Sequence, residues 1–163
     1  MKTVILVFFA TIFLGWAVVR IERGVNFSMN CSQYLKRAAD ANTIELAQAN
    51  LKTAIEYAEH ESLTNGVVSI FLHQPSNDIG FWYSNLIASQ KELGQVTANT
   101  TQLEKSNLLM KLRETLTDNS KEGTTITRPK GISIYPANSL FFWWAIIGFG
   151  VSGLMFVLMA FEY

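Results

Sequence analysis

The charged residues of this chain avoid its two ends, and this distribution constrains the fold more than any motif does. Outside residues 20–130, the charged side chains are Lys2 and Glu162. The terminal runs 3–19 and 140–161 are uncharged and apolar. A helix of about 20 apolar residues spans the ~30 Å hydrocarbon core of a bilayer. We therefore predict one transmembrane helix at 3–19 and a second at 140–161.

Two further features bear on these runs. A cleaved signal peptide is the alternative for the first run, but no small-x-small cleavage site precedes Arg20, which favours an uncleaved anchor. Trp143 and Trp144 stand near the start of the second run, and Tyr163 stands just after its end. Amphipathic rings settle at lipid headgroups in these positions, so both runs are expected to cross the membrane.

The basic residues near the second run predict the orientation of the chain. Lys121, Arg128 and Lys130 precede this run, whereas Glu162 follows it. Cytoplasmic flanks of transmembrane helices are enriched in lysine and arginine. We therefore expect a multi-pass protein of the cell (inner) membrane with the middle of the chain in the cytoplasm.

Each terminal run contains two small residues at four-residue spacing. Thr11 and Gly15 form this pair in the first run, and Gly148 and Ser152 form it in the second. Small residues let helix backbones approach closely in lipid. We predict that these four residues form the helix-packing site, within one chain or between two copies. The glycines at 148–153 also match a dinucleotide-binding pattern, but the strand and the acidic residue that this chemistry needs are missing.

The middle of the chain has the composition of a small water-facing domain. The whole chain has 13 basic and 13 acidic residues, so its net charge is zero. Nucleic-acid-binding domains carry a strongly basic surface, so no nucleic-acid partner is expected. Cys31 is the single cysteine, so a packed core rather than disulfides must hold the domain together. Its thiol is expected to be buried or interfacial.

Apolar periodicity predicts a helical domain at 24–118. Residues 28–62 carry an apolar stripe at helical spacing, in one long helix or in two consecutive helices with Asn42 or Thr43 as the second cap. A stop is expected at residues 65–66, which read Asn-Gly.

Two more helices are expected, at 79–93 and at 103–116. Thr101 and Glu104 have the spacing of a capping box at the start of the latter. The β-branched run 67–72 predicts a short strand or an extended segment packed under the helices.

Residues 119–139 are rich in glycine and proline and predict a turn-rich connector, with a brief extended piece at 132–135. The predicted fold is therefore mainly α: two transmembrane helices flank a small bundle of three to four helices with a possible short extended segment.

The sequence contains no catalytic constellation. A zinc-peptidase helix needs a second histidine four residues after the first, but Thr64 occupies that position relative to His60. His73 and Cys31 have no partners at metal-ligand spacing. We therefore expect no enzymatic activity, no metal and no cofactor.

Phe81, Trp82 and Tyr83 form the densest aromatic cluster outside the terminal runs. Three consecutive helical residues cover most of the helix circumference, so at least one ring must point away from a single core stripe. In one interpretation Trp82 lies in the core and its neighbours cover the 67–72 segment. In the other the three rings form a partner-binding site.

Several segments resemble a set of small uncharacterised bacterial membrane proteins that have two terminal transmembrane helices and a helical middle domain. The segments are YLKRAADANTIELA (34–47), GFWY (80–83), QLEKSNLLMKLRETL (102–116) and GISIYP (131–136). No activity is known for this set. The resemblance implies a bacterial origin and carries over no functional residue.

Two functional classes fit these features. The first is a membrane-anchored interaction or scaffold protein whose partners are the lipid bilayer, another protein and, in a homo-oligomer, a second copy. The alternative is a sensory or ligand-binding input module of a membrane receptor system, which has the same layout. Pro129 and Pro136 count against the alternative because they break the rigid helix that such receptors run into the membrane.

Overall fold

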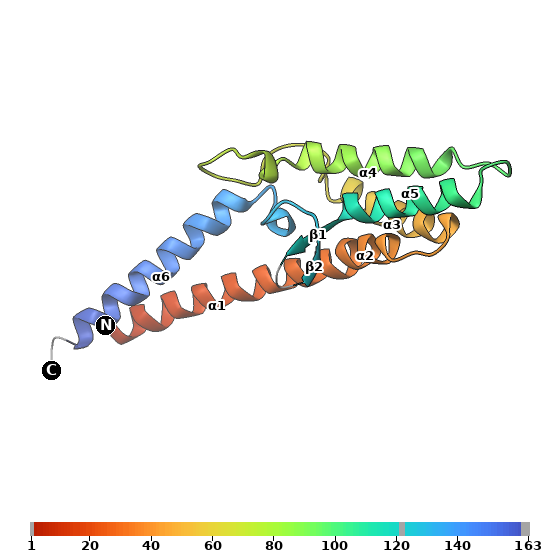
Figure 1. Ribbon diagram of the computed structural model, residues 1–163. Coiled ribbons are helices and arrows are strands. Elements are labelled where there is room, and N and C mark those ends of the chain that lie inside the picture. The colour runs from red at the N-terminus through yellow and green to blue at the C-terminus, as the bar shows by residue number, and fades with distance from the viewer. Residues whose placement is uncertain (1, 121–122, 161–163) are drawn as a thin grey trace. The chain divides into compact units, whose positions relative to one another are not determined.

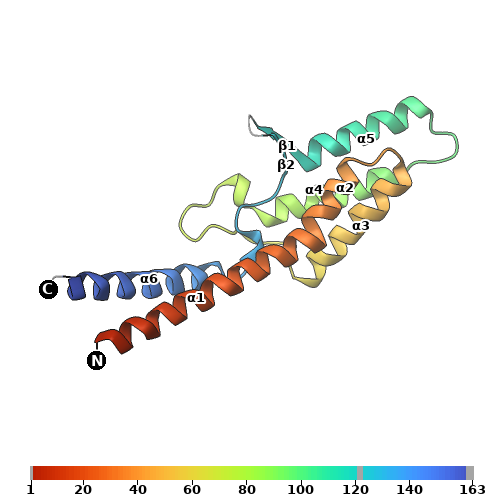
Figure 2. The same ribbon diagram turned by 90° about the horizontal axis from the view of Figure 1, so that it is seen from below.

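Figures 1 and 2 show the fold of the chain as a computed structural model. It describes residues 2–120 and 123–160, except for the side chains at 2, 3, 5, 6, 120, 155, 156 and 158–160. The described chain is mainly helical, as the sequence predicts, and it divides into two compact units. Unit 1 comprises Met1–Val25 and Ser133–Tyr163, and unit 2 comprises Asn26–Ile132.

Unit 1 is a pair of antiparallel helices. It contains α6 (Asn138–Ala160) and all but the last two residues of α1 (Lys2–Phe27), which lie side by side in both views. Two tryptophans join the helices. The Trp16 indole N–H donates to the carbonyl of Phe141 at 2.9 Å, and the Trp144 indole N–H donates to the carbonyl of Ile12 at 3.1 Å.

Among the residues described, no helix combines the length and the apolar character needed to cross a bilayer. The predicted spans 3–19 and 140–161 contain undescribed side chains at 3, 5, 6, 155, 156 and 158–161. Lys121, Glu162 and Tyr163, which entered the predictions of orientation and anchoring, also lie outside the described residues.

Unit 2 begins with two consecutive helices rather than one long one. A π-helical turn, η1 (Ser28–Ser32), leads into α2 (Gln33–Ala39), and a break precedes α3 (Ile44–His60). The Thr43 hydroxyl accepts a hydrogen bond from the amide of Leu46, so Thr43 rather than Asn42 is the cap.

The end of α3 lies before the predicted stop at residues 65–66. Ser62 adopts a left-handed conformation with φ 58°, and the amide of Leu63 donates to the carbonyl of Ala58 at 2.7 Å. This is a Schellman cap, a motif in which glycine usually occupies the left-handed position. Because serine rather than glycine occupies the left-handed position, the sequence did not indicate that α3 ends here.

The 67–72 segment is not packed under the helices, so that part of the prediction is wrong. Val67 forms a single β-bridge with Asp78, and Val68 is buried. Ile70, Phe71 and Leu72 are exposed and belong to a loop that leads to a short 3-10 turn, η2 (Pro75–Asn77). The apolar character of residues 70–72 therefore does not reflect burial.

Side-chain caps begin both remaining helices. The Asp78 carboxylate accepts from the amide of Phe81 at 2.9 Å and starts α4 (Ile79–Gly94). The capping box of α5 (Gln102–Leu116) forms as predicted, with the amide of Thr101 donating to Glu104 at 2.7 Å. This backbone hydrogen bond lowers the pKa of Glu104.

A two-stranded hairpin and a 3-10 turn differ from the prediction for the segment after α5. β1 (Thr117–Ser120) and β2 (Gly123–Ile126) form an antiparallel pair in which Thr117 lies opposite Ile126. The brief extended piece predicted at 132–135 is wrong, because η3 (Ile132–Ile134) is a 3-10 turn. Gly131, at φ 93°, turns the chain just before η3 and so prevents an extended continuation.

The core of unit 2 lies between its helices. α2 packs against α3 and α5, and α4 packs against α3 and α5. Its largest fully buried aliphatic side chains are Leu35, Leu51, Ile79, Leu86, Leu116 and Ile132. Each buried aliphatic side chain of this size contributes about 1.5–3 kcal/mol, which suits a domain that has no disulfide.

Cys31 is buried in this core, as the sequence led us to expect, and it gives a first testable prediction. Its thiol lies 3.9 Å from the carbonyl of Ala54, and burial raises its pKa to about 12. Only the thiolate is nucleophilic, so the native protein should not react with a maleimide at neutral pH. Mass spectrometry with and without guanidinium chloride checks this. Rapid labelling of the native protein would contradict the placement of Cys31.

Candidate functional site

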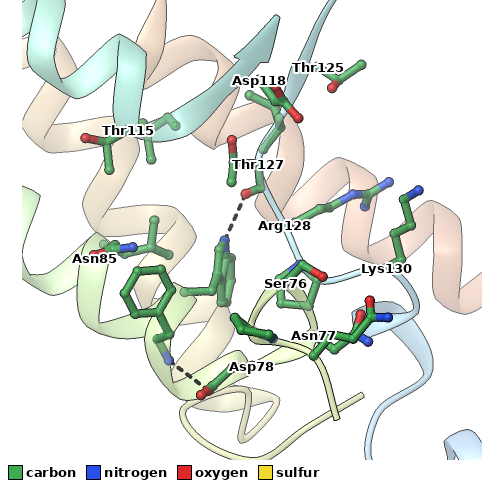
Figure 3. Close-up of a pocket in the computed structure, with 18 residues that line it drawn as sticks. Ser76, Asn77, Asp78, Asn85, Thr115, Asp118, Thr125, Thr127, Arg128 and Lys130 are labelled. Atoms are coloured by element: carbon green, nitrogen blue, oxygen red, sulfur yellow. Dashed lines mark hydrogen bonds between the residues drawn. The ribbon is translucent and has the colours of Figure 1, made fainter. Parts of the chain in front are cut away.

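Unit 2 contains a groove with a volume of about 730 Å³. The loop 74–78 and the first turns of α4 form one wall, and the end of α5 and the segment 125–130 form the other. We call this hollow the α4 groove. Figure 3 shows Asn85 and Thr115 on one side of it and Arg128 and Lys130 on the other.

Trp82 fixes the wall of the α4 groove. The side chain is 5% exposed, and its indole N–H donates to the carbonyl of Thr127 at 3.1 Å, a bond drawn in Figure 3. The amide of Thr127 in turn donates to the carbonyl of Leu116 at 2.9 Å. The segment that follows β2 is therefore held between α4 and α5 by one side-chain and one backbone bond.

The three rings of the aromatic cluster have different surroundings. Trp82 belongs to the core, whereas Phe81 lines the α4 groove and is 63% exposed. Tyr83 does not line the groove, because its hydroxyl donates to the Glu59 carboxylate at 2.6 Å. This hydrogen bond raises the pKa of Tyr83 to about 12, so the phenol stays neutral at physiological pH. The groove thus brings together Phe81 and Trp82 but not Tyr83.

Two cations and two carboxylates line the α4 groove, and one of the carboxylates, that of Asp78, is already engaged in capping α4. Arg128 is engaged on its other side, where its guanidinium lies 5.2 Å from the Phe27 ring and donates to the Ser32 hydroxyl at 3.1 Å. Lys130 and Asp118 are exposed lining residues. With an exposed ring, a cation and a carboxylate, the groove can contact both apolar and polar groups of a ligand.

Neither histidine lines the α4 groove. The described residues contain no group of three or more histidine, cysteine, aspartate or glutamate residues placed to hold a metal ion. His60 is exposed and pairs with Glu61 at 3.0 Å. His73 is exposed in the loop after residues 70–72.

The predicted helix-packing residues lie in unit 1, where glycine faces an aromatic ring rather than another small residue. A Cβ placed on Gly148 would meet the Cβ of Phe13 at 3.4 Å, and one placed on Gly15 would meet the ring of Trp144 at 3.9 Å. Both glycines therefore lie on the contact between α1 and α6. Gly150 and Gly153 face open space and take no part in this contact.

Comparison with known proteins gives no relative for this arrangement. No family model, curated protein or solved structure matches the chain. We therefore argue the function from the α4 groove and from the contact between α1 and α6.

Sequence reasoning missed the wall of the α4 groove formed by residues 125–130. A signal was present, because Gly123 is followed by the β-branched run Thr124–Ile126, which is typical of a hairpin strand. The sequence does not reveal that the residue after this strand contacts Trp82. The indole of Trp82 donates to the carbonyl of Thr127, 45 residues away, and such a distant hydrogen bond leaves no local sequence pattern.

Proposed function

We propose that this chain is a membrane-anchored interaction protein. In this proposal unit 1 is a transmembrane hairpin, and unit 2 is a water-facing helical domain that binds another protein at the α4 groove.

The observation that carries the proposal is the apolar outer surface of unit 1. Both helices expose large apolar side chains away from their mutual contact, and continuous apolar surfaces of this extent are typical of protein or membrane contacts. On α1 they are Val4, Val7, Phe8, Leu14, Val18, Ile21 and Val25, and on α6 they are Leu140, Trp143, Ile146, Ile147, Leu154 and Val157. Lipid acyl chains are the natural cover for a surface that surrounds both helices.

The polar groups within the hairpin are compatible with lipid. The hydroxyl of Thr11 donates to the carbonyl of Val7, and the hydroxyl of Ser152 donates to the carbonyl of Gly148 at 2.6 Å. In a bilayer, polar groups must be satisfied internally because water is absent. These two side chains therefore add no unpaired donor to the hydrocarbon region.

One end of the hairpin has the composition of a membrane interface. The guanidinium of Arg20 lies 5.5 Å from the Trp16 ring, and that of Arg23 lies 5.7 Å from the Phe141 ring. Arginine and tryptophan are suited to the headgroup region, where a charged or polar tip reaches water and an apolar body remains in lipid. This end leads into unit 2 through Val25 and Ser133.

We place the protein in the inner membrane of a bacterium with unit 2 in the cytoplasm, because Arg128 and Lys130 precede α6. Alkaline phosphatase fused to the C-terminus should then be active, since that terminus is exported. A fluorescent protein at the same position should be dark. The reverse pattern would put unit 2 on the outer side.

The interaction role of unit 2 is supported by Phe81. A phenylalanine that is 63% exposed at the rim of a groove can bury its ring against a partner, and aromatic residues in such positions dominate interface energetics. The α4 groove is also within the range of small-molecule sites, about 300–1,000 Å³. A ligand-binding input module is therefore the second candidate function.

Site-specific crosslinking separates these candidates. A photocrosslinking amino acid at position 81 of the full chain, activated in native membranes, should give a discrete protein adduct. Leu103 is the matched control position, because it is 71% exposed and does not line the α4 groove. An adduct at twice the mass of the chain would identify a second copy as the partner. If position 81 gives the same products as position 103, the groove does not bind a protein.

A further inference from the structure

We propose that the partner of the α4 groove is an extended peptide segment with an acidic end, which adds a third strand along β2. This inference rests on the proposed interaction role of the groove and names the kind of partner that the groove binds. All the residues that carry it belong to unit 2.

The register of the hairpin leaves one edge of β2 open. The amide of Thr127 donates to the carbonyl of Leu116 at 2.9 Å, so these two residues form a hydrogen-bonded pair. Pairs of this type alternate with non-bonded pairs along an antiparallel ladder. Ile126, which lies opposite Thr117, therefore directs its N–H and C=O away from β1. Thr117 agrees with this pattern, because its amide donates to the carbonyl of Arg113 in α5 instead.

In the part of the chain that the structure describes, no further strand pairs with this open edge, because the sheet consists of β1 and β2. Ile126 also lines the α4 groove, so the edge and the groove meet at this residue. An unpaired strand edge is a template for another extended segment, whose amides and carbonyls complete the missing hydrogen bonds. The edge therefore favours a partner in extended conformation over a helix, whose backbone groups are already paired.

The wall formed by α4 presents a group that is suited to a peptide backbone. Asn85 stands one helical turn after Phe81, and both side chains line the groove. The carboxamide of Asn85 is half-buried and makes no hydrogen bond to another described residue. A carboxamide carries both an acceptor and donors, as a peptide group does. Asn85 can therefore bond a backbone group of the segment while the Phe81 ring covers one of its apolar side chains.

The charges of the groove define the chemistry of one end of the segment. After β2 the chain continues into residues 127–130, where Pro129 is buried and its neighbours Arg128 and Lys130 are exposed. The residue before a proline favours extended backbone, in which alternate side chains point the same way, and Figure 3 shows both cations on one side of the groove.

Neither of these two cations forms an ion pair with a described residue. A carboxylate on a segment that runs along β2 and past residues 128–130 would pair with them. Asp118 belongs to β1 and would repel a second carboxylate beside the hairpin. The acidic group is therefore confined to the end of the segment that lies beside Arg128 and Lys130.

A peptide library tests this inference on the full chain in detergent micelles. Short random peptides displayed on phage are selected against the native chain, with the Ile126→Pro variant as the reference. Proline at position 126 removes an outward N–H and leaves the hydrogen bonds between β1 and β2 in place. Peptides enriched on the native chain should combine β-branched or aromatic residues with an aspartate or glutamate near one end. Equal enrichment on Ile126→Pro would overturn the inference.

Backbone methylation of an enriched peptide gives a second readout, which does not depend on how a variant folds. Alternate amides of an added strand face β2. N-methyl groups in one register should therefore weaken binding by about tenfold or more, whereas those in the other register should change it little. Equal losses in both registers, or no loss in either, would overturn the pairing along β2.

Charge reversal tests the acidic end of the segment. Lys130→Glu should weaken binding of the same peptide by about fivefold and should shift a new selection towards lysine and arginine. Lys91→Glu is the matched control, because Lys91 is exposed, has no ion pair with a described residue and does not line the groove. Equal effects of the two variants would overturn the assignment of an acidic partner.

Crosslinking at position 81 separates this inference from the proposed function. If a photocrosslinker at this position captures a protein in native membranes but no peptide is enriched, the partner presents a folded surface. The inference is then overturned, and the interaction function stands. If neither crosslinking nor peptide selection detects binding, the interaction function fails, and this inference fails with it.

Discussion

Replacing Gly148 with leucine should separate α1 from α6. A Cβ at this position already lies 3.4 Å from the Cβ of Phe13, so the remaining side-chain atoms would overlap the α1 backbone or the Phe13 ring. Overpacking of a close contact costs about 1–3 kcal/mol. In lipid there is little hydrophobic drive to restore the pairing, because acyl chains are as apolar as leucine. We expect a clear loss of thermal stability of unit 1 in detergent, measured by tryptophan fluorescence in a Trp82→Phe background.

Gly153→Leu is the matched control for this prediction. It makes the same substitution on the same helix, but nothing lies within 4 Å of a Cβ at that position. Phe13→Ala should restore part of the stability lost in Gly148→Leu, because it removes the ring that the leucine meets. Equal behaviour of the two leucine variants would show that Gly148 is not a contact between the helices.

An engineered disulfide between α1 and α6 tests the contact between positions 13 and 148 directly. Cysteines at positions 13 and 148 would have their Cβ atoms about as close as a disulfide requires, since native bridges have Cβ separations of about 3.5–4.5 Å. Oxidation should give an intrachain bridge. A bridge formed only between two chains would show that the pairing is intermolecular.

Trp82→Ala should have the largest effect on the stability of unit 2. The ring is almost fully buried, and its indole N–H holds the segment after β2 through Thr127. Removal of a buried aromatic side chain costs about 3–5 kcal/mol. In the fragment 26–132, whose helices should unfold cooperatively, chemical denaturation followed by circular dichroism should show this loss. Trp82→Phe should cost less, because it retains most of the ring and loses one hydrogen bond worth about 1 kcal/mol.

Phe81→Ala is the control that separates folding from binding. Its ring is largely exposed, so the free energy of unfolding should change by less than about 0.5 kcal/mol. The same substitution should abolish partner binding at the α4 groove. A Phe81→Ala variant as unstable as Trp82→Ala would mean that Phe81 serves the core, and the groove would lose its main anchor.

The sequence predicted those features that depend on neighbouring residues. The capping box between Thr101 and Glu104 forms because its two partners are three residues apart in any helix. Cys31 proved to be buried, which is one of the two settings, buried or interfacial, that the sequence left open. Such features need no knowledge of tertiary structure.

Features that depend on distant residues were predicted less well. The β-branched run 67–72 carries the composition of a buried strand, yet Ile70, Phe71 and Leu72 lie exposed in a loop. An apolar, β-branched composition makes a segment suitable for burial, but the tertiary structure determines whether other elements pack over it. Similarly, the α4 groove forms because residues 125–130 lie beside Trp82. No residue spacing in the sequence predicts this contact.

Extraction of membranes with alkaline carbonate tests the central claim, that α1 and α6 anchor the chain in a bilayer. Carbonate removes proteins that are bound to membranes only peripherally. The full chain should stay in the membrane pellet, and the fragment 26–132 should be recovered in the soluble fraction. Release of the full chain into the carbonate wash would contradict the account.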